Sequence, residues 1–202
     1  MPRVSDAHLA ARREQILTAA RRCFARNGFH ATSMQDVIAE AGLSVGAVYR
    51  YFTGKDELRK AVAEETVGAL LQELAAVTGH HPPLPLAEAM ARVVGVVETR
   101  LAEPDSVGRI AVQAWGEAVR DPQLGQFATE AFQTMREAFT TLARRAQQAG
   151  ELPPAADPEA AGYVLLALVP GFVLQRVLTG GPDRATYTAG LTALLATRPA
   201  VS

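Results

Sequence analysis

Residues 32–52 hold the side chains whose types and spacing best suit a chemical task, namely contact with a polyanion. The stretch reads Thr-Ser-Met-Gln-Asp-Val-Ile-Ala-Glu-Ala-Gly-Leu-Ser-Val-Gly-Ala-Val-Tyr-Arg-Tyr-Phe. Gly42 divides it, and glycine readily adopts the positive φ that a tight chain reversal requires. The pattern predicts two short helices around a turn, the first over about 33–41 and the second over 45–51.

The ends and inner faces of these two helices follow from residue type. Thr32, with Gln35 three residues on, resembles a capping box and predicts where the first helix begins. Ser44 is the predicted N-cap of the second helix. Val48 and Phe52 lie four residues apart, so we expect both to face inward.

The other side chains of the second helix are expected nearer the outside. A short, aromatic-rich helix of this kind suits insertion into the major groove of DNA. Gly46 and Ala47 would let the backbone approach closely, while tyrosine hydroxyls and Arg50 can reach phosphates or base edges. Lys55 begins the next helix, where its ammonium group and the adjacent amides can hold a phosphate. The competing interpretation is that the aromatic residues are ordinary core side chains of a helical hairpin.

From Gly28 to Leu58 the sequence closely resembles the N-terminal domain of the TetR (tetracycline repressor) family. The residues that carry the resemblance are Gly-Phe, Thr-Ser, Asp-Val, Ala-Gly-Leu-Ser-Val-Gly-Ala-Val-Tyr-Arg-Tyr-Phe and Lys-Asp-Glu-Leu, in that order. The likeness is detailed over about residues 10–60, and the rest agrees in length and helix content. Ile38 stands where a small alanine is common, which predicts a difference in local packing.

The resemblance implies a homodimeric, all-α repressor that binds a double-stranded DNA operator. Each subunit would contact DNA through one helix-turn-helix, the two short helices of residues 32–52, which we call the reading head. By analogy, the phosphate contacts would be Ser33, Ser44, Tyr49, Tyr51 and Lys55. The candidates on the base side would be Met34, Val45, Gly46, Ala47 and Arg50. Because Val45 is apolar, any reading of bases at that position would be by contact and not by a hydrogen bond.

Charge and composition fit a protein with one anion-binding end. Residues 1–60 hold ten Lys and Arg against six Asp and Glu, whereas residues 61–202 hold ten against fifteen. The basic N-terminal part and the acidic remainder of the chain indicate that one end contacts a polyanion.

The single cysteine, Cys23, excludes a disulfide framework and is expected to be an unreactive core residue. No apolar signal segment opens the sequence, so we expect a cytoplasmic location.

The elements that must position these residues are all predicted to be helices. Thirty-eight alanines and the lack of period-two alternation favour an all-α fold of about nine helices. We expect a three-helix, helix-turn-helix DNA-binding domain over 1–54, with the connecting helix reaching to about 60. A larger ligand-binding and dimerisation domain is expected over 55–202. The predicted helices cover about 6–27, 33–41, 45–51, 55–77, 90–101, 105–120, 124–150, 158–179 and 184–198.

The acidic remainder is expected to bind an effector and a second copy of the chain. The segment from Tyr163 to Leu174 contains no charged residue. It is too short for a membrane span. A helix that is apolar all round is expected to be covered on more than one side. The candidate dimer surface is Leu168, Phe172, Tyr187, Leu191, Leu194 and Leu195. Two-fold symmetry would place two reading helices about 34–36 Å apart on a palindromic operator. The candidate pocket for a small, apolar effector is Arg109, Gln113, Trp115, Phe127, Phe132, Met135, Phe139 and Tyr163.

Other chemistry finds little support in the sequence. His80 and His81 are adjacent, which is the wrong spacing for two metal ligands on one helix face. Gly-rich phosphate loops, a Ser-His-Asp set and an HExxH motif are absent, so no cofactor, metal or catalytic residue is expected. The remaining alternatives are an activator or a ligand-independent regulator of the same fold, and a small all-α enzyme or carrier.

Overall fold

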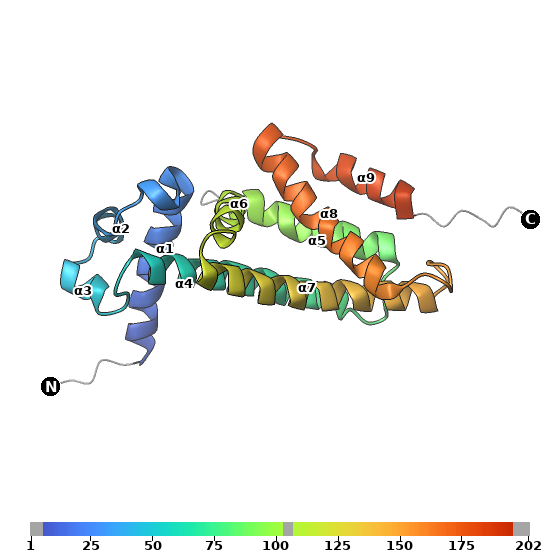
Figure 1. The fold of residues 1–202 in the computed structure, drawn as a ribbon, viewed down its shortest axis with the longest axis horizontal. Helices are drawn as coiled ribbons and strands as arrows, with labels where there is room; N and C mark the ends of the chain where they lie inside the picture. Colours follow the sequence, from blue (N-terminus) through green and yellow to red (C-terminus); the bar gives the residue numbers. More distant parts are fainter. Residues whose placement is uncertain (1–5, 103–106, 196–202) are drawn as a thin grey trace, which may run out of the picture. The chain divides into compact units, whose positions relative to one another are not determined.

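The chain is helical wherever its structure is described. A computed structural model describes residues 6–102 and 107–195, and over these residues it contains nine α-helices and no strand (Figure 1). The predicted all-α class and helix number are therefore confirmed. The helices are α1 (Asp6–Ala31), α2 (Met34–Ala41), α3 (Val45–Tyr49), α4 (Lys55–Thr78), α5 (Leu86–Ala102), α6 (Val107–Ala118), α7 (Pro122–Gln148), α8 (Pro158–Thr179) and α9 (Arg184–Leu195).

The chain forms two compact units. Unit 1 takes in residues up to 66 together with 104–125, so it contains α1, α2, α3, the start of α4, and α6. Unit 2 takes in residues 67–103 and those from 126 onward. Helices α4 and α7 each contribute residues to both units.

The first helix departs from its predicted end. It continues as far as Ala31, with a kink at Gly28, where φ is 84° and ψ is 164°. The φ of Gly28 is positive, but its ψ lies outside the left-handed helical region that ends many helices, and only glycine adopts such angles without strain. Cys23 is fully buried, as predicted, and burial raises the pKa of its thiol.

Unit 1 has one apolar core. It joins side chains of α1, α2, α3, the start of α4 and α6, including Phe24, Val37, Val48, Leu58 and Ile110. Short α2 and α3 are therefore held by packing on their neighbours more than by their own length.

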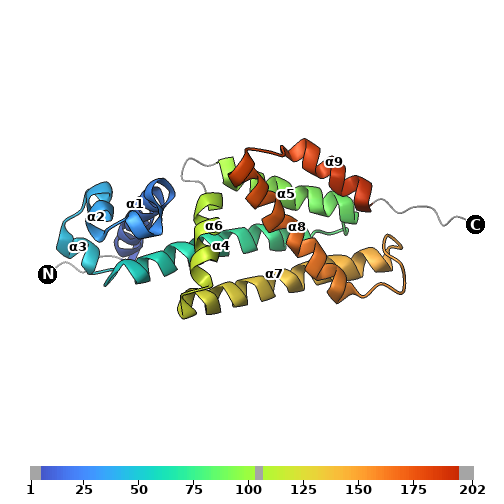
Figure 2. The ribbon, with the colours of Figure 1, turned by 45° about the horizontal axis from the view of Figure 1, so that its top comes forward.

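In unit 2, α5 packs against α8 and α9 (Figure 2). Helix α8 has the predicted bounds and the predicted cap, because the Asp157 side chain accepts a hydrogen bond from the Glu159 N–H. With 22 residues, α8 is long and apolar enough to cross a membrane on length and composition alone, a test that the core helix of a soluble protein also passes.

Burial assigns two different faces to α8. One face packs inside unit 2 through Leu165, Leu166, Val169, Phe172 and Val173. The opposite face exposes four large apolar side chains, Tyr163, Val164, Leu174 and Leu178. At 3.6 residues per turn, these four fall within an arc of about 100°. The helix is thus a core element on one side and an apolar surface on the other.

Candidate nucleic-acid interface

Helix α3 is anchored on one side and open on the other. Ser44 is its N-cap, and the Ser44 hydroxyl accepts a hydrogen bond of 3.3 Å from the Ala47 N–H. Val48 and Phe52 are buried, as their spacing predicted. Val45 and Tyr49 are 60% and 45% exposed, so the outward face is also as expected. The helix ends at Tyr49, two residues earlier than predicted.

The turn between α2 and α3 fixes the angle at which α3 is presented. Gly42 has φ 63° and ψ 31°, the left-handed conformation expected of it. Its N–H donates to the Ala39 carbonyl, and the Leu43 N–H donates to the Ile38 carbonyl. Both Leu43 and Ile38 are partly buried against the core of unit 1.

The predicted capping box was displaced by one residue. Ser33, and not Thr32, is the N-cap of α2, and its partner is Asp36 instead of Gln35. Thr32 is buried, with its hydroxyl donating to the carbonyl oxygens of Gly28 and Cys23. The Asp36 carboxylate accepts hydrogen bonds from the Ser33 N–H and hydroxyl, which lower the pKa of Asp36.

The N-cap of α2 uses the same Ser33 groups that were predicted to contact a phosphate. Both donors of the residue, the N–H and the O–H, point to the Asp36 carboxylate at 2.8 Å and 2.7 Å. A phosphate contact by Ser33 would have to replace one of these two bonds.

Ion pairs remove much of the positive charge that the sequence places on α1. Arg21 pairs with Glu14 and Glu65, while Arg22 and Arg26 pair with Glu40. Within the described part of the chain, two other arginines of unit 1, Arg13 and Arg50, are not paired with a carboxylate in this way. The guanidinium carbon of Arg13 lies 5.5 Å from the centre of the Phe52 ring. Arg50 forms no ion pair with any residue that the structure describes.

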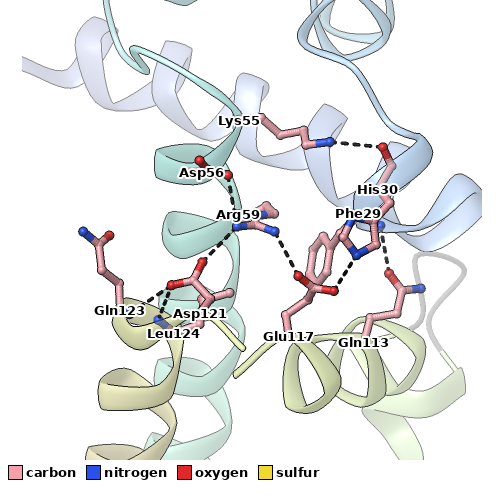
Figure 3. Close-up of polar contacts among 10 residues, drawn as sticks. All are labelled: Phe29, His30, Lys55, Asp56, Arg59, Gln113, Glu117, Asp121, Gln123 and Leu124. Carbon is pink, nitrogen blue, oxygen red and sulfur yellow. Dashed lines mark hydrogen bonds and ion pairs between the residues drawn. The ribbon is translucent and has the colours of Figure 1, made fainter. Parts of the chain in front are cut away.

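Lys55, a predicted phosphate contact, is already engaged in the structure. Its ammonium group donates a 3.1 Å hydrogen bond to the His30 carbonyl oxygen, as Figure 3 shows. The start of α4 is thereby tied to the end of α1. Tyr51 and Ala47 are half-buried, Met34 packs against the core of unit 1, and Gly46 is exposed.

A buried arginine organises the polar contacts between α4 and α6. Arg59 is only 8% exposed, yet its guanidinium lies 3.3 Å from Glu117, 3.0 Å from Asp121 and 3.0 Å from Asp56 (Figure 3). The Glu117 carboxylate also lies 2.7 Å from Nε2 of His30. We name Arg59, Asp56, Glu117, Asp121 and His30 the Arg59 cluster.

Two further contacts reinforce the Arg59 cluster. The Gln113 side-chain oxygen accepts a 3.1 Å hydrogen bond from the Phe29 N–H, beside the Gly28 kink. Asp121 uses its second oxygen to cap α7, accepting from the N–H groups of Gln123 and Leu124. The end of α1, the start of α4 and α6 are therefore joined at several points within unit 1.

Sequence reasoning did not find the Arg59 cluster. The available signal was the spacing of Gln113, Glu117 and Asp121, which recur every four residues along one face. Their partners lie 58 to 87 positions away in the chain, so spacing alone does not reveal them.

The predicted effector residues are divided between the two units. In unit 1, Gln113 contacts Phe29 as described, Trp115 is half-buried, and the Arg109 side chain lies outside the described part of the chain. In unit 2, Phe127, Phe132 and Met135 are half-buried, and Phe139 is fully buried in the core. Tyr163 is exposed, with its hydroxyl accepting from Arg136.

The predicted dimer residues also have unequal environments. Phe172 and Leu191 are buried within unit 2, whereas Leu194 is 80% exposed. Tyr187 packs its ring 4.8 Å from Phe172 and donates its hydroxyl to the Leu168 carbonyl at 2.6 Å. Leu195 is half-buried. Among the described residues of unit 2, the large exposed apolar side chains lie instead on the outer face of α8 and at Leu194.

Two short helices around a left-handed glycine, with the second helix capped, anchored and open on its outer face, define a helix-turn-helix DNA-binding protein. Residues 16–62 match the family described as bacterial regulatory proteins, tetR family. Residues 87–199 match the family described as BetI-type transcriptional repressor, C-terminal. The chain therefore belongs to the TetR family of transcriptional regulators, and it is a DNA-binding regulator and not an enzyme.

Individual relatives agree with this assignment. The chain is 33% identical over 156 residues to the HTH-type transcriptional repressor Rv1474c of Mycobacterium tuberculosis, covering 75% of each chain. The solved SmeT–triclosan complex, from Stenotrophomonas maltophilia, is 25% identical, with a TM-score of 0.75 and 91% of each chain covered. A Saccharomonospora viridis regulator in complex with choline shares the fold at 21% identity, with a TM-score of 0.78, covering 94% of this chain and all of the other.

We predict that Arg59→Met lowers the free energy of unfolding by about 2 kcal/mol, because it leaves the partly buried Glu117 and Asp121 without their cation. Chemical denaturation followed by circular dichroism measures the change. Arg92→Met is the matched control, since Arg92 forms an exposed pair with Glu88 worth under about 0.5 kcal/mol. Equal losses in the two variants would contradict a structural role for the Arg59 cluster.

Proposed function

We propose that this regulator is a repressor that binds a palindromic operator as a homodimer, with α3 of each subunit in the major groove. The outward face of α3 is the observation that carries the proposal. Val45, Tyr49 and Arg50 are exposed there while Val48 is fixed in the core. A regulator of this kind acts on chromosomal DNA, so we propose a cytoplasmic location.

The charges described above determine which cations we expect DNA to meet. Arg21, Arg22 and Arg26 are paired with carboxylates, so their contribution to phosphate binding is reduced. Arg50 has no ion pair among the described residues, and Lys55 binds only a neutral carbonyl oxygen. We assign the principal electrostatic contacts with DNA to these two residues.

We expect Tyr49→Phe and Lys55→Ala each to weaken operator binding about tenfold, because each removes one hydrogen-bond donor to a phosphate. Lys55→Ala should also reduce the slope of log affinity against log salt by about 0.9. Fluorescence anisotropy with a labelled operator over a salt series measures both quantities.

Lys60→Ala is the control for these variants. It removes the same charge from α4, but Lys60 pairs with Glu64 and should leave operator affinity nearly unchanged. Wild-type affinity in both Tyr49→Phe and Lys55→Ala would contradict the assigned contacts.

The outer face of α8 supports the homodimer. A contiguous apolar surface on a soluble chain is typical of a protein interface. Ala167 and Gly171 lie in the same arc as Tyr163, Val164 and Leu178, so a second helix could approach closely. A two-fold axis beside α8 would pair this face with itself.

We predict that Leu178→Glu yields monomers, because it places a charge in the apolar face at a position that is 72% exposed in the single chain. Light scattering coupled to size exclusion measures the mass. Phe172→Glu is a poor test, since Phe172 is buried and the variant would lose its fold. Val119→Glu, at an exposed valine in the turn after α6, is the control and should stay dimeric. If the Leu178→Glu variant remained dimeric, the proposed interface on α8 would be wrong.

The effector class follows from the side chains of α7. Phe127, Phe132 and Met135 are half-buried apolar groups on one helix of unit 2, which favours a neutral, apolar ligand. SmeT, a relative at 25% identity, has been solved with triclosan. The proposed response is a population shift, in which the effector prefers a state that does not match the operator.

We expect a neutral aromatic probe, triclosan, to raise the midpoint of thermal unfolding and to release the chain from operator DNA. Choline, a small quaternary ammonium cation, should do neither at equal concentration. Thermal scanning and a gel-shift titration measure the two effects. Release by choline alone would contradict an apolar effector, and an operator complex unaffected by any ligand tried would favour the ligand-independent alternative.

A further inference from the structure

Val45 is an apolar side chain in a position that folding does not explain. It is 60% exposed, at the first position of α3 after the Ser44 cap, whereas Val48 three residues later is fully buried. A β-branched residue has a lower helix propensity than alanine, so local structure does not favour valine there. Among the described residues of unit 1, the other large apolar side chains with comparable exposure are Tyr49 and Val119.

The first turn of α3 has no polar side chain with which to read a base. Val45, Gly46 and Ala47 carry none, and the Ala47 N–H is already bonded to Ser44. Hydrogen-bond readout is therefore unavailable to side chains in this turn. What remains is contact with apolar surface.

The apolar group that projects furthest from a base edge into the major groove is the C5 methyl group of thymine. We infer that Val45 recognises the methyl group of a thymine in each operator half-site. This inference rests on the proposed placement of α3 in the major groove. It adds a base identity that the fold does not supply.

The surroundings of Val45 agree with such a contact. Val45 and Tyr49 are four residues apart and both exposed, so they share one face of α3. A methyl group added at Gly46 would meet nothing within 4 Å, so the backbone beside Val45 is open to close approach. A single valine is too small to form a protein interface, which leaves a small apolar group as the fitting partner.

The experiment compares thymine with uracil, which differ only by the methyl group. The full-length chain first selects its operator from a random duplex pool, and each thymine is then replaced singly by deoxyuridine. We expect replacement at one position in each half-site to weaken wild-type binding about fourfold, the contribution of one buried methyl group. Anisotropy titrations at fixed salt give the affinities.

Variants of the chain identify the reader of that methyl group. Val45→Ala should bind the thymine duplex about as weakly as the wild type binds the uracil duplex, and should no longer distinguish the two. Val119→Ala, at the other exposed valine among the described residues of unit 1, should retain the full difference. Tyr49→Phe should weaken binding to both duplexes by the same factor. Circular dichroism verifies that each variant keeps its helical content.

Two outcomes overturn the inference. One is wild-type binding that is indifferent to uracil at every position, and the other is a Val45→Ala variant that still distinguishes the two bases at the sensitive position. Failure of the wild-type chain to select any duplex would instead overturn the proposed function. The two failures are therefore distinguishable.

Discussion

The burial of Val48 and Phe52 is the constraint on which the reading head depends. Helix α3 has five residues, and isolated helices shorter than about 12–15 residues are marginal in water. Burying two large apolar side chains stabilises the folded state by about 1.5–3 kcal/mol each, before conformational entropy is subtracted. These two side chains thus hold α3 in place and also decide which of its faces meets solvent. The exposure of Val45 and Tyr49 is a consequence of that anchoring.

Local patterns in the sequence were sufficient to predict most of the structure of the reading head. The left-handed Gly42, the Ser44 cap and the inward pair on α3 follow from residue type and a spacing of four. The start of α2 was misplaced by one residue because Thr32 and Ser33 are both good N-caps. Burial of the Thr32 side chain decided between them, and burial is a tertiary property.

Features that depend on contacts between residues far apart in the chain could not be predicted from local sequence patterns. Helix α8 is apolar nearly all round, so periodicity does not define which face is inside. The choice of Phe172 for a surface therefore rested on composition, and packing within unit 2 places it inside. The Arg59 cluster is a similar case, because its members come from three segments far apart in the chain. Each pair becomes visible only when α6 is seen to pack in the same unit as α1.

The Arg59 cluster gives α6 a defined relation to the reading head. Arg59, on the second turn of α4, is held by carboxylates of α6 and of the turn that follows it, while His30 and Phe29 bind α6 from the end of α1. Moving α6 relative to α1 and α4 would expose or separate a buried guanidinium and its partners, which is costly. We therefore expect α6 and the reading head to move together. An effector that displaces α6 would then displace α3 with it, by no more free energy than its preference for the displaced state.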